Sequence, residues 1–378
     1  MRSLGILTYH KYYNYGTMLQ AYALCKAIEN NFDCTAEIID FMPKNDYVGK
    51  KLFLTRFKRI FTYIKDFDKY YNLYKFKDCE LKKQAEFDKF YKDNLKLSNE
   101  RSDNYESLKK QCEKYQAVMI GSDQTWNPYV SRWRDFLLEF LSEKETVKLS
   151  YAPSIGTGKI PEEYREIFKN ALSEFSALSC REEGGAKILS ELLGKTVSPV
   201  LDPTLLLKPE EWEKVSSDFT FEKPYLLTYF LGDNTEHRKT AENIAKQKGL
   251  EIRAIPMSYL EMKNWNIKKE TVGPDGFISL IKNADFICTD SFHGTMFSVN
   301  FKKNFLSFQK RKSTDINSDN NRLSDALKTF GLENRLCLSS PDLSDIDYSN
   351  AEKILEEKRA KSYSYLKTAI DLIPERKL

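Results

Sequence analysis

The segment from residue 284 to residue 308 orders its residues as a strand, a loop, a helix and a second strand. Apolar, β-favouring runs occupy 286–289 and 305–308, a polar turn-forming stretch occupies 290–294, and 295–299 has helical spacing. In an open parallel sheet, the loop after a strand lies at the edge where ligands bind, and the amides that open the next helix favour an anion. His293 is therefore placed where chemistry tends to occur, and a simple helix-capping turn is the alternative.

The beginning of the chain has the same order of strand, loop, helix and strand. A strand at 5–9, a polar aromatic loop and a helix from Thr17 precede a strand at 36–41. Gly16 is the single glycine of that loop, so the dinucleotide fingerprint GxGxxG is missing. Later strands are expected at 117–120, 148–151, 175–180 and 197–201, and the pattern restarts with strands at 224–231 and 252–255.

This repetition in a chain of 378 residues predicts an α/β protein with two Rossmann-like domains facing across a cleft. The first domain is expected at 1–207, with a basic helical insertion at 42–115, and the second at 208–345. A long helix within 346–378 is expected to pack back on the first domain.

Composition excludes several classes of function. A formal net charge of +4 argues against a dedicated nucleic-acid binder. The seven cysteines are scattered and never form a CxxC pair, so neither a zinc site nor a disulfide framework is indicated, and no metal is expected. No apolar run fits a signal peptide or a membrane span, so we expect a cytoplasmic location.

The basic insertion has two interpretations. Lysine and arginine interleave with aromatic and aliphatic residues between Lys50 and Lys69. Such a helix can lie on an anionic membrane, which would give a peripheral contact with the inner membrane surface. The alternative, a solvated helix that packs its aromatic face on the domain, is the favoured one.

A polar loop follows the predicted strand at 117–120. Its sequence from Gly121 to Pro128 is GSDQTWNP, and most of these side chains exchange hydrogen bonds. The position after a strand indicates recognition of a sugar or a phosphate, with Trp126 offering a flat face to a pyranose ring. A turn around Asn127 with a packed Trp126 is the alternative.

Cationic side chains follow other strands. Arg181 ends the strand at 175–180, where its guanidinium can clamp a carboxylate or phosphate, unless it pairs with a neighbouring glutamate. Ser154 lies in a loop of small residues that allows close approach of a ligand. Further anion contacts are available from a cluster near the His293 segment, for which a solvated flank is the alternative: Lys310, Arg311, Lys312 and Arg322.

Short motifs in a specific order make the chain resemble the polysaccharide pyruvyl transferase family. Their residues are Asn14-Tyr15-Gly16, Gln20-Ala21-Tyr22, Ile120-Gly121-Ser122-Asp123-Gln124, Ser150-Tyr151-Ala152, Cys180-Arg181-Glu182, Leu201-Asp202-Pro203-Thr204 and Ser291-Phe292-His293-Gly294. The resemblance implies a GT-B-like fold and transfer of the pyruvyl group of phosphoenolpyruvate to sugar hydroxyls. The product is a pyruvate ketal, made in surface or capsular glycan biosynthesis on a sugar acceptor, for which a lipid-linked oligosaccharide is one candidate.

The resemblance also implies residue roles. His293 matches the catalytic histidine and Arg181 the donor-binding arginine, whereas Ser291 stands where well-known members carry a second arginine. Asp290 or Asp123 is expected to act as the base on the sugar hydroxyl, and no cofactor is expected beyond the donor substrate. The predicted substrate-binding residues are completed by Asn14, Gly16, Gln20, Ser122, Gln124, Trp126, Ser154, Ser291, Gly294, Thr295, Arg311 and Arg322.

Two other functions fit the same pattern. A GT-B glycosyltransferase that uses a nucleotide sugar would share the fold and the anion-binding cleft. A non-catalytic protein of glycan binding or assembly would bind sugars without a donor.

Overall fold

A computed structural model describes residues 2–43, 76–142, 146–257, 261–262, 267–309, 320–338 and 341–375. The basic stretch around 50–69 and the cluster Lys310 to Lys312 lie outside these residues. The described part of the expected insertion, at 76–115, contains helices α5 and α6, at Lys77–Asn94 and Tyr105–Cys112.

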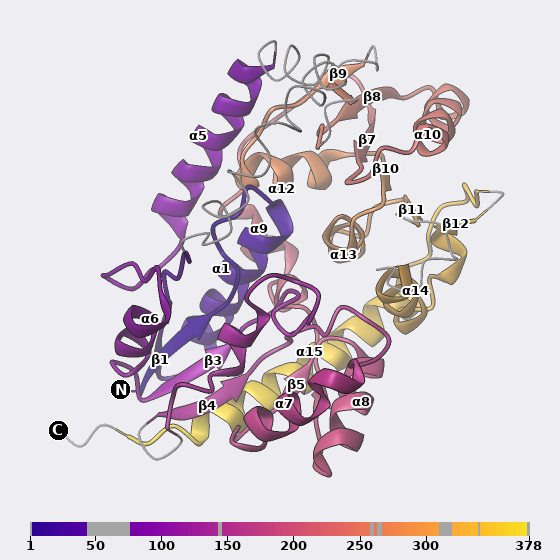
Figure 1. Cartoon of the computed structure of the whole chain (residues 1–378). Coiled ribbons are helices and arrows are strands. Elements are labelled where there is room, and N and C mark those ends of the chain that lie inside the picture. Colours follow the sequence, from indigo (N-terminus) through magenta and orange to yellow (C-terminus); the bar gives the residue numbers. More distant parts are fainter. Residues whose placement is uncertain are drawn as a thin grey trace, which may run out of the picture.

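Two parallel sheets form the framework, which confirms the predicted α/β class (Figure 1). The first sheet has the order β2-β1-β3-β4, and an isolated bridge from Leu149 to Ala177 leads to the pair β5-β6. The second sheet has the order β12-β11-β10-β7-β8-β9. The strands are β1 Arg2–Leu7, β2 Cys34–Ile38, β3 Ala117–Ile120, β4 Val147–Ser150, β5 Ser179–Cys180, β6 Ser198–Pro199, β7 Tyr225–Tyr229, β8 Glu251–Ala254, β9 Lys268–Lys269, β10 Phe286–Thr289, β11 Phe305–Phe308 and β12 Leu336–Cys337.

Helices connect the strands and cover the sheets. In the described residues, the other α-helices are α1 Tyr15–Asn31, α7 Glu162–Ser173, α8 Glu183–Leu193, α9 Pro209–Glu213, α10 Thr235–Lys248, α12 Pro274–Asn283, α13 Phe292–Asn300, α14 Asn320–Thr329 and α15 Ser349–Asp371. Short 3-10 helices lie at Trp133–Leu137, Pro203–Leu205 and Glu333–Arg335.

Strand β1 ends two residues before its predicted end, and the next side chains explain why. Thr8 uses its hydroxyl to donate to the carbonyl oxygen of Ser122, at 2.8 Å. His10 faces the carbonyl oxygen of Thr8 with Nδ1, at 3.0 Å. These polar side chains bond across the loop, so the chain leaves the ladder and turns toward α1.

Helix α1 belongs to the first half of the chain but packs against the second. The ring of Tyr15 stacks on Phe277 of α12 with centroids 4.7 Å apart, and its hydroxyl donates to the carbonyl oxygen of Val272 at 2.9 Å. The amide of Asn300, at the end of α13, donates to the carbonyl oxygens of Thr204 and Leu207 in the connection between the halves. These contacts fix the start of α1 beside the start of α13.

The long helix α15 returns to the first half of the chain, where Figure 1 shows it beside β4 and β5. Arg359 donates to the carbonyl oxygen of Leu205, Ser362 accepts from the amide of Leu201, and Tyr365 donates to the carbonyl oxygen of Ser150. The three bonds lie on one side of the helix and extend over two turns.

Candidate functional site

A cavity of about 150 Å³ lies where the first turns of α1 and α13 meet. Asn14 caps α1 by accepting from the amide of Thr17, and Ser291 caps α13 by accepting from the amide of Gly294. Each helix directs its partly positive amino end at the same space, an arrangement that favours a bound anion. The cavity is lined by Asn14, Thr17, Asp123, Gln124, Leu231, Asp290, Ser291, Phe292, His293, Arg322 and Leu323.

The imidazole of His293 joins the two halves of the chain. One edge of the ring lies against Gly16, where a β carbon would come within 2.0 Å of Nδ1. The opposite nitrogen, Nε2, lies 3.5 Å from Oδ2 of Asp202. The side chain is only 12% exposed, so the ring has little freedom to turn away from either neighbour.

Asp202 is the point at which the polar side chains of the site converge. Its Oδ1 accepts from the amide and hydroxyl of Thr204, at 3.0 and 2.7 Å. Its Oδ2 accepts from Nη1 of Arg181 at 3.1 Å and from the hydroxyl of Ser122 at 3.2 Å. One buried carboxylate therefore holds the arginine of the first half and the histidine of the second.

The ionised form of Asp202 is strongly favoured. Burial raises its pKa, but the imidazole of His293, the guanidinium of Arg181 and the hydrogen bonds from Thr204 outweigh burial and hold the pKa well below its usual value. Asp202 is thus a fixed negative charge between two cationic or potentially cationic groups.

Arg181 is buried but incompletely paired. Its Nε donates to Glu182 at 3.0 Å, and its guanidinium lies 4.4 Å from the ring centre of Phe292. Its Nη2 is buried and meets no hydrogen-bond acceptor within the described part of the chain. A buried donor of this kind is available to an anionic ligand. Arg181 borders a second cavity of about 620 Å³, which shares Phe292 and Arg322 with the smaller one.

Two carboxylates line the smaller cavity beside His293. Asp123 accepts from the hydroxyl of Thr17 at 2.7 Å and from the amide of Gln124 at 2.8 Å. Asp290 accepts at both oxygens from backbone amides, those of Leu231 at 2.5 Å and Gly232 at 2.9 Å. Because a hydroxyl can also accept a proton whereas an amide cannot, Asp123 is better placed than Asp290 to pass a proton on.

The structure brings most of the predicted site residues together. The predicted residues that line the smaller cavity are Asn14, Asp123, Gln124, Asp290, Ser291, His293 and Arg322. Gly16 contacts the imidazole of His293. Gly294 packs against Thr289, the last residue of β10, where a β carbon on Gly294 would come within 2.4 Å of the Thr289 hydroxyl. Ser291 is uncharged and uses its hydroxyl oxygen to cap α13. It therefore does not replace the positive charge of the family arginine.

The prediction for Trp126 is wrong. The ring is fully buried, packs edge-on against Phe175 and donates from its indole nitrogen to the carbonyl oxygen of Phe136. It has no exposed face for a pyranose, and the alternative of a packed tryptophan describes it correctly.

Four further predicted residues lie behind the cavity and do not line it. The amide nitrogen of Gln20 donates to two carbonyl oxygens and the Thr8 hydroxyl, while Ser154 donates to Glu182. Ser122 bonds Asp202, and Thr295 bonds the hydroxyl of Ser307. In this structure they support the residues that line the site. Arg311 lies outside the described residues.

Sequence reasoning did not assign a role to Asp202 or Thr17. Asp202 lies three residues after β6, as Asp123 does after β3, and Asp290 directly follows β10. This shared position after a strand was the available signal. Thr17 gave none, because its contact with Asp123 depends on how α1 packs.

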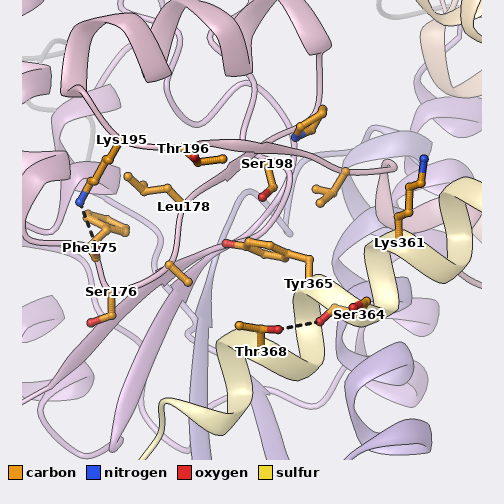
Figure 2. Close-up of a pocket in the computed structure, with 13 residues that line it drawn as sticks. Phe175, Ser176, Leu178, Lys195, Thr196, Ser198, Lys361, Ser364, Tyr365 and Thr368 are labelled. Atoms are coloured by element: carbon orange, nitrogen blue, oxygen red, sulfur yellow. Dashed lines mark hydrogen bonds between the residues drawn. The ribbon is translucent and has the colours of Figure 1, made fainter.

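A separate hollow of about 550 Å³ lies between α15 and the segments around β5 and β6 (Figure 2). Lys195 spans one end by donating to the carbonyl oxygen of Phe175, and the ring of Tyr365 lies along the floor. Neither Arg181 nor His293 borders it, and its lining has no paired acid and base.

Within the described ranges, no helix is long and apolar enough to span a bilayer.

Comparison with known proteins places this geometry in context. A UDP-N-acetylglucosamine 2-epimerase superposes with a TM-score of 0.51 at 9% identity, covering 100% of this chain and 98% of that chain. A putative UDP-N-acetylglucosamine 2-epimerase from Listeria monocytogenes gives a TM-score of 0.48 at 9% identity, with coverage of 98% and 90%. The UDP-GlcNAc 2-epimerase of Methanocaldococcus jannaschii gives 0.41 at 14% identity, with coverage of 94% and 99%. At these identities the first similarity concerns the GT-B-like fold alone, and the other two carry no argument.

No curated protein sequence matches the chain. Residues 14–309, in contrast, match the family described as polysaccharide pyruvyl transferase. This span includes both helix starts, Arg181, Asp202 and His293. The chain therefore belongs to the polysaccharide pyruvyl transferase family.

Proposed function

We propose that this protein transfers the pyruvyl group of phosphoenolpyruvate to two hydroxyls of a sugar, forming a pyruvate ketal in surface or capsular glycan biosynthesis. The observation that carries the proposal is the convergence of Arg181 and His293 on Asp202 beside a small cavity faced by two helix amino ends. Phosphoenolpyruvate is small and carries a carboxylate and a phosphate, so it suits a site with a buried guanidinium and oriented amides.

The donor needs a second cation, since Ser291 stands in the place of the family arginine. Arg322 lines both cavities, which makes it the described side chain best placed to serve. Its position supports a donor held between Arg181 and Arg322, with the reacting carbons toward His293.

His293 is proposed as the general acid. It delivers a proton to the methylene carbon of the donor while a sugar hydroxyl attacks the adjacent carbon and gives its proton to Asp123. A second hydroxyl then attacks the same carbon, the carbon–oxygen bond to phosphate breaks, and the hydroxyl proton leaves with the phosphate. Asp202 lies 3.5 Å from Nε2 of His293 and orients the ring for this step.

The experiment is phosphate release from phosphoenolpyruvate with methyl galactosides, methyl mannosides and methyl N-acetylhexosaminides, with the product examined for a ketal by mass spectrometry. We expect sugar-dependent release in the wild type and a loss of about a hundredfold or more in His293→Ala. Wild-type turnover in a folded His293→Ala would overturn the role of the histidine.

A ligand comparison tests the proposal against the other functions. Phosphoenolpyruvate is expected to raise the melting temperature, because a ligand that binds only the native state stabilises it. Stabilisation by UDP but not by phosphoenolpyruvate would favour a glycosyltransferase. Glycan binding that no donor alters, with no phosphate release, would favour a non-catalytic protein.

A further inference from the structure

Exposed tyrosines gather beside the cavity on two loops of the first sheet. Of the eight large hydrophobic side chains that are exposed in the described part of the chain, three lie on the loops after β1 and β3: Tyr12, Tyr13 and Tyr129. Strands β1 and β3 are neighbours and parallel, so their following loops share one edge of the sheet. The same loops contribute Asn14, Asp123 and Gln124 to the cavity.

Tyr12 is the tyrosine tied most closely to the cavity. Its carbonyl oxygen accepts from the amide of Asn14, the residue that caps α1, at 2.6 Å. Burial raises the pKa of its hydroxyl, and Arg132 and Asp123 both lie near enough for their charges to act on that hydroxyl. Tyr12 therefore lies two residues from Asn14, which lines the cavity.

The ring of Tyr12 is held in place from beneath. It meets the ring of Tyr9 in an edge contact with centroids 5.6 Å apart, and Tyr9 in turn meets Phe136 at 4.7 Å. Even so, 47% of Tyr12 is open to solvent. A ring that is fixed on one side and exposed on the other loses little conformational entropy when a flat ligand covers it.

We infer that Tyr12 is the platform on which the acceptor sugar stacks, with the carboxylate of Asp123 accepting a hydrogen bond from a hydroxyl of that sugar. The inference rests on the proposed function, which requires a sugar to lie beside His293. A pyranose suits this surface because it has an apolar C–H face for the tyrosine ring and hydroxyl groups around its edge for the carboxylate. Trp126, the aromatic residue that the sequence indicated for this role, is buried and cannot serve.

The test measures sugar binding directly, by saturation-transfer NMR with methyl galactosides, methyl mannosides and methyl N-acetylhexosaminides. We expect saturation of at least one glycoside by the wild type and by Tyr12→Phe, which keeps the ring. Tyr12→Ala should bind that glycoside roughly tenfold more weakly. Tyr105→Ala is the matched control, because Tyr105 has the same 47% exposure but lies on α6 against Phe140 and not on the loops after β1 and β3.

Two results would overturn the inference: no saturation of any glycoside by the wild type, or equal saturation by the wild type and Tyr12→Ala. The melting-temperature shift caused by phosphoenolpyruvate is measured on the same samples. A normal shift in Tyr12→Ala with weakened sugar binding supports the platform. No shift in the wild type points instead to failure of the proposed donor.

Discussion

Gly16 and His293 are in van der Waals contact across the two halves of the chain, so closely that a β carbon on Gly16 would come 2.0 Å from Nδ1. Gly16 is the second residue of α1, where a helix tolerates alanine well. The glycine is therefore explained by the space that the imidazole needs and not by the backbone.

Gly16→Ala should displace the imidazole and lower turnover by about a hundredfold or more, the contribution expected of a general acid. The measurement is kcat for phosphate release. Gly158→Ala is the control: a β carbon at Gly158 meets nothing within 4 Å, and Gly158 lines neither cavity of the site. A Gly16→Ala enzyme as active as Gly158→Ala would show that the ring position does not matter.

The sequence made the neighbourhood of His293 predictable because the strand, loop and helix are local. The periodicity of residues 284–308 predicts β10 and β11 to the residue, whereas α13 begins at Phe292, three residues before the predicted helix, and so includes His293. The loop after an inner parallel strand has few places to lie. The positions of Asn14, Asp123 and Asp290 follow from the same rule, because each of these residues lies after a parallel strand.

The sequence did not make Asp202 or the burial of Trp126 predictable, because both depend on distant packing. Asp202 meets Arg181 and His293 only after two sheets and a connecting segment have been assembled. Trp126 is enclosed by Phe136 and Phe175, whose positions relative to the loop are tertiary. A polar loop with one tryptophan has the same pattern whether its ring faces a sugar or the core.

Asp202→Asn should lower both stability and activity. The substitution removes one of the two carboxylates that pair with the buried Arg181 and leaves Glu182 as the other. Removing one partner of a buried pair costs up to roughly 3 to 5 kcal/mol. The substitution also removes the negative charge beside His293. We expect kcat for phosphate release to fall as well, because the imidazole loses the carboxylate beside Nε2.

Urea denaturation and kcat for phosphate release, measured on folded Asp202→Asn, separate these effects. A Ser122→Ala variant is the comparison, because it removes only one hydrogen bond to the same oxygen. We expect Ser122→Ala to keep nearly the wild-type kcat. A wild-type kcat in Asp202→Asn would mean that Asp202 is structural and does not act through the histidine.

Asp123 combines a strained backbone with a proposed chemical role, and two substitutions distinguish them. Its φ of 75° lies in the left-handed region, which asparagine tolerates and alanine resists. Asp123→Asn should therefore keep nearly wild-type stability in urea. Asp123→Ala should lose about 1 to 2 kcal/mol, since it also loses its bonds to Thr17 and Gln124.

Both Asp123 variants should lose phosphate release by about a hundredfold, if the carboxylate takes the proton of the sugar hydroxyl. Saturation transfer to the bound glycoside should weaken in both variants as well. Full turnover in Asp123→Asn would exclude Asp123 as the base and leave Asp290 to be examined in the same assay.

Acid should weaken the fold partly through Asp40, which anchors the loop that leads to α1. Its Oδ1 faces Nε2 of His10 and its Oδ2 accepts from Nε of Arg101, both at 3.2 Å. Burial raises the pKa of Asp40, but these partners outweigh burial and lower the pKa below its usual value. A carboxyl group with a lowered pKa in the folded state stabilises the fold above its unfolded pKa of about 3.9, and this stabilisation is lost as the pH falls through the folded pKa.

We expect Asp40→Asn to have a lower melting temperature than the wild type at pH 6 and the difference to shrink below about pH 4. Asp88→Asn, on an exposed position of α5, controls for the loss of one negative charge. A melting-temperature difference for Asp40→Asn that stays constant from pH 6 to pH 3 would show that its carboxylate does not stabilise this loop through its charge.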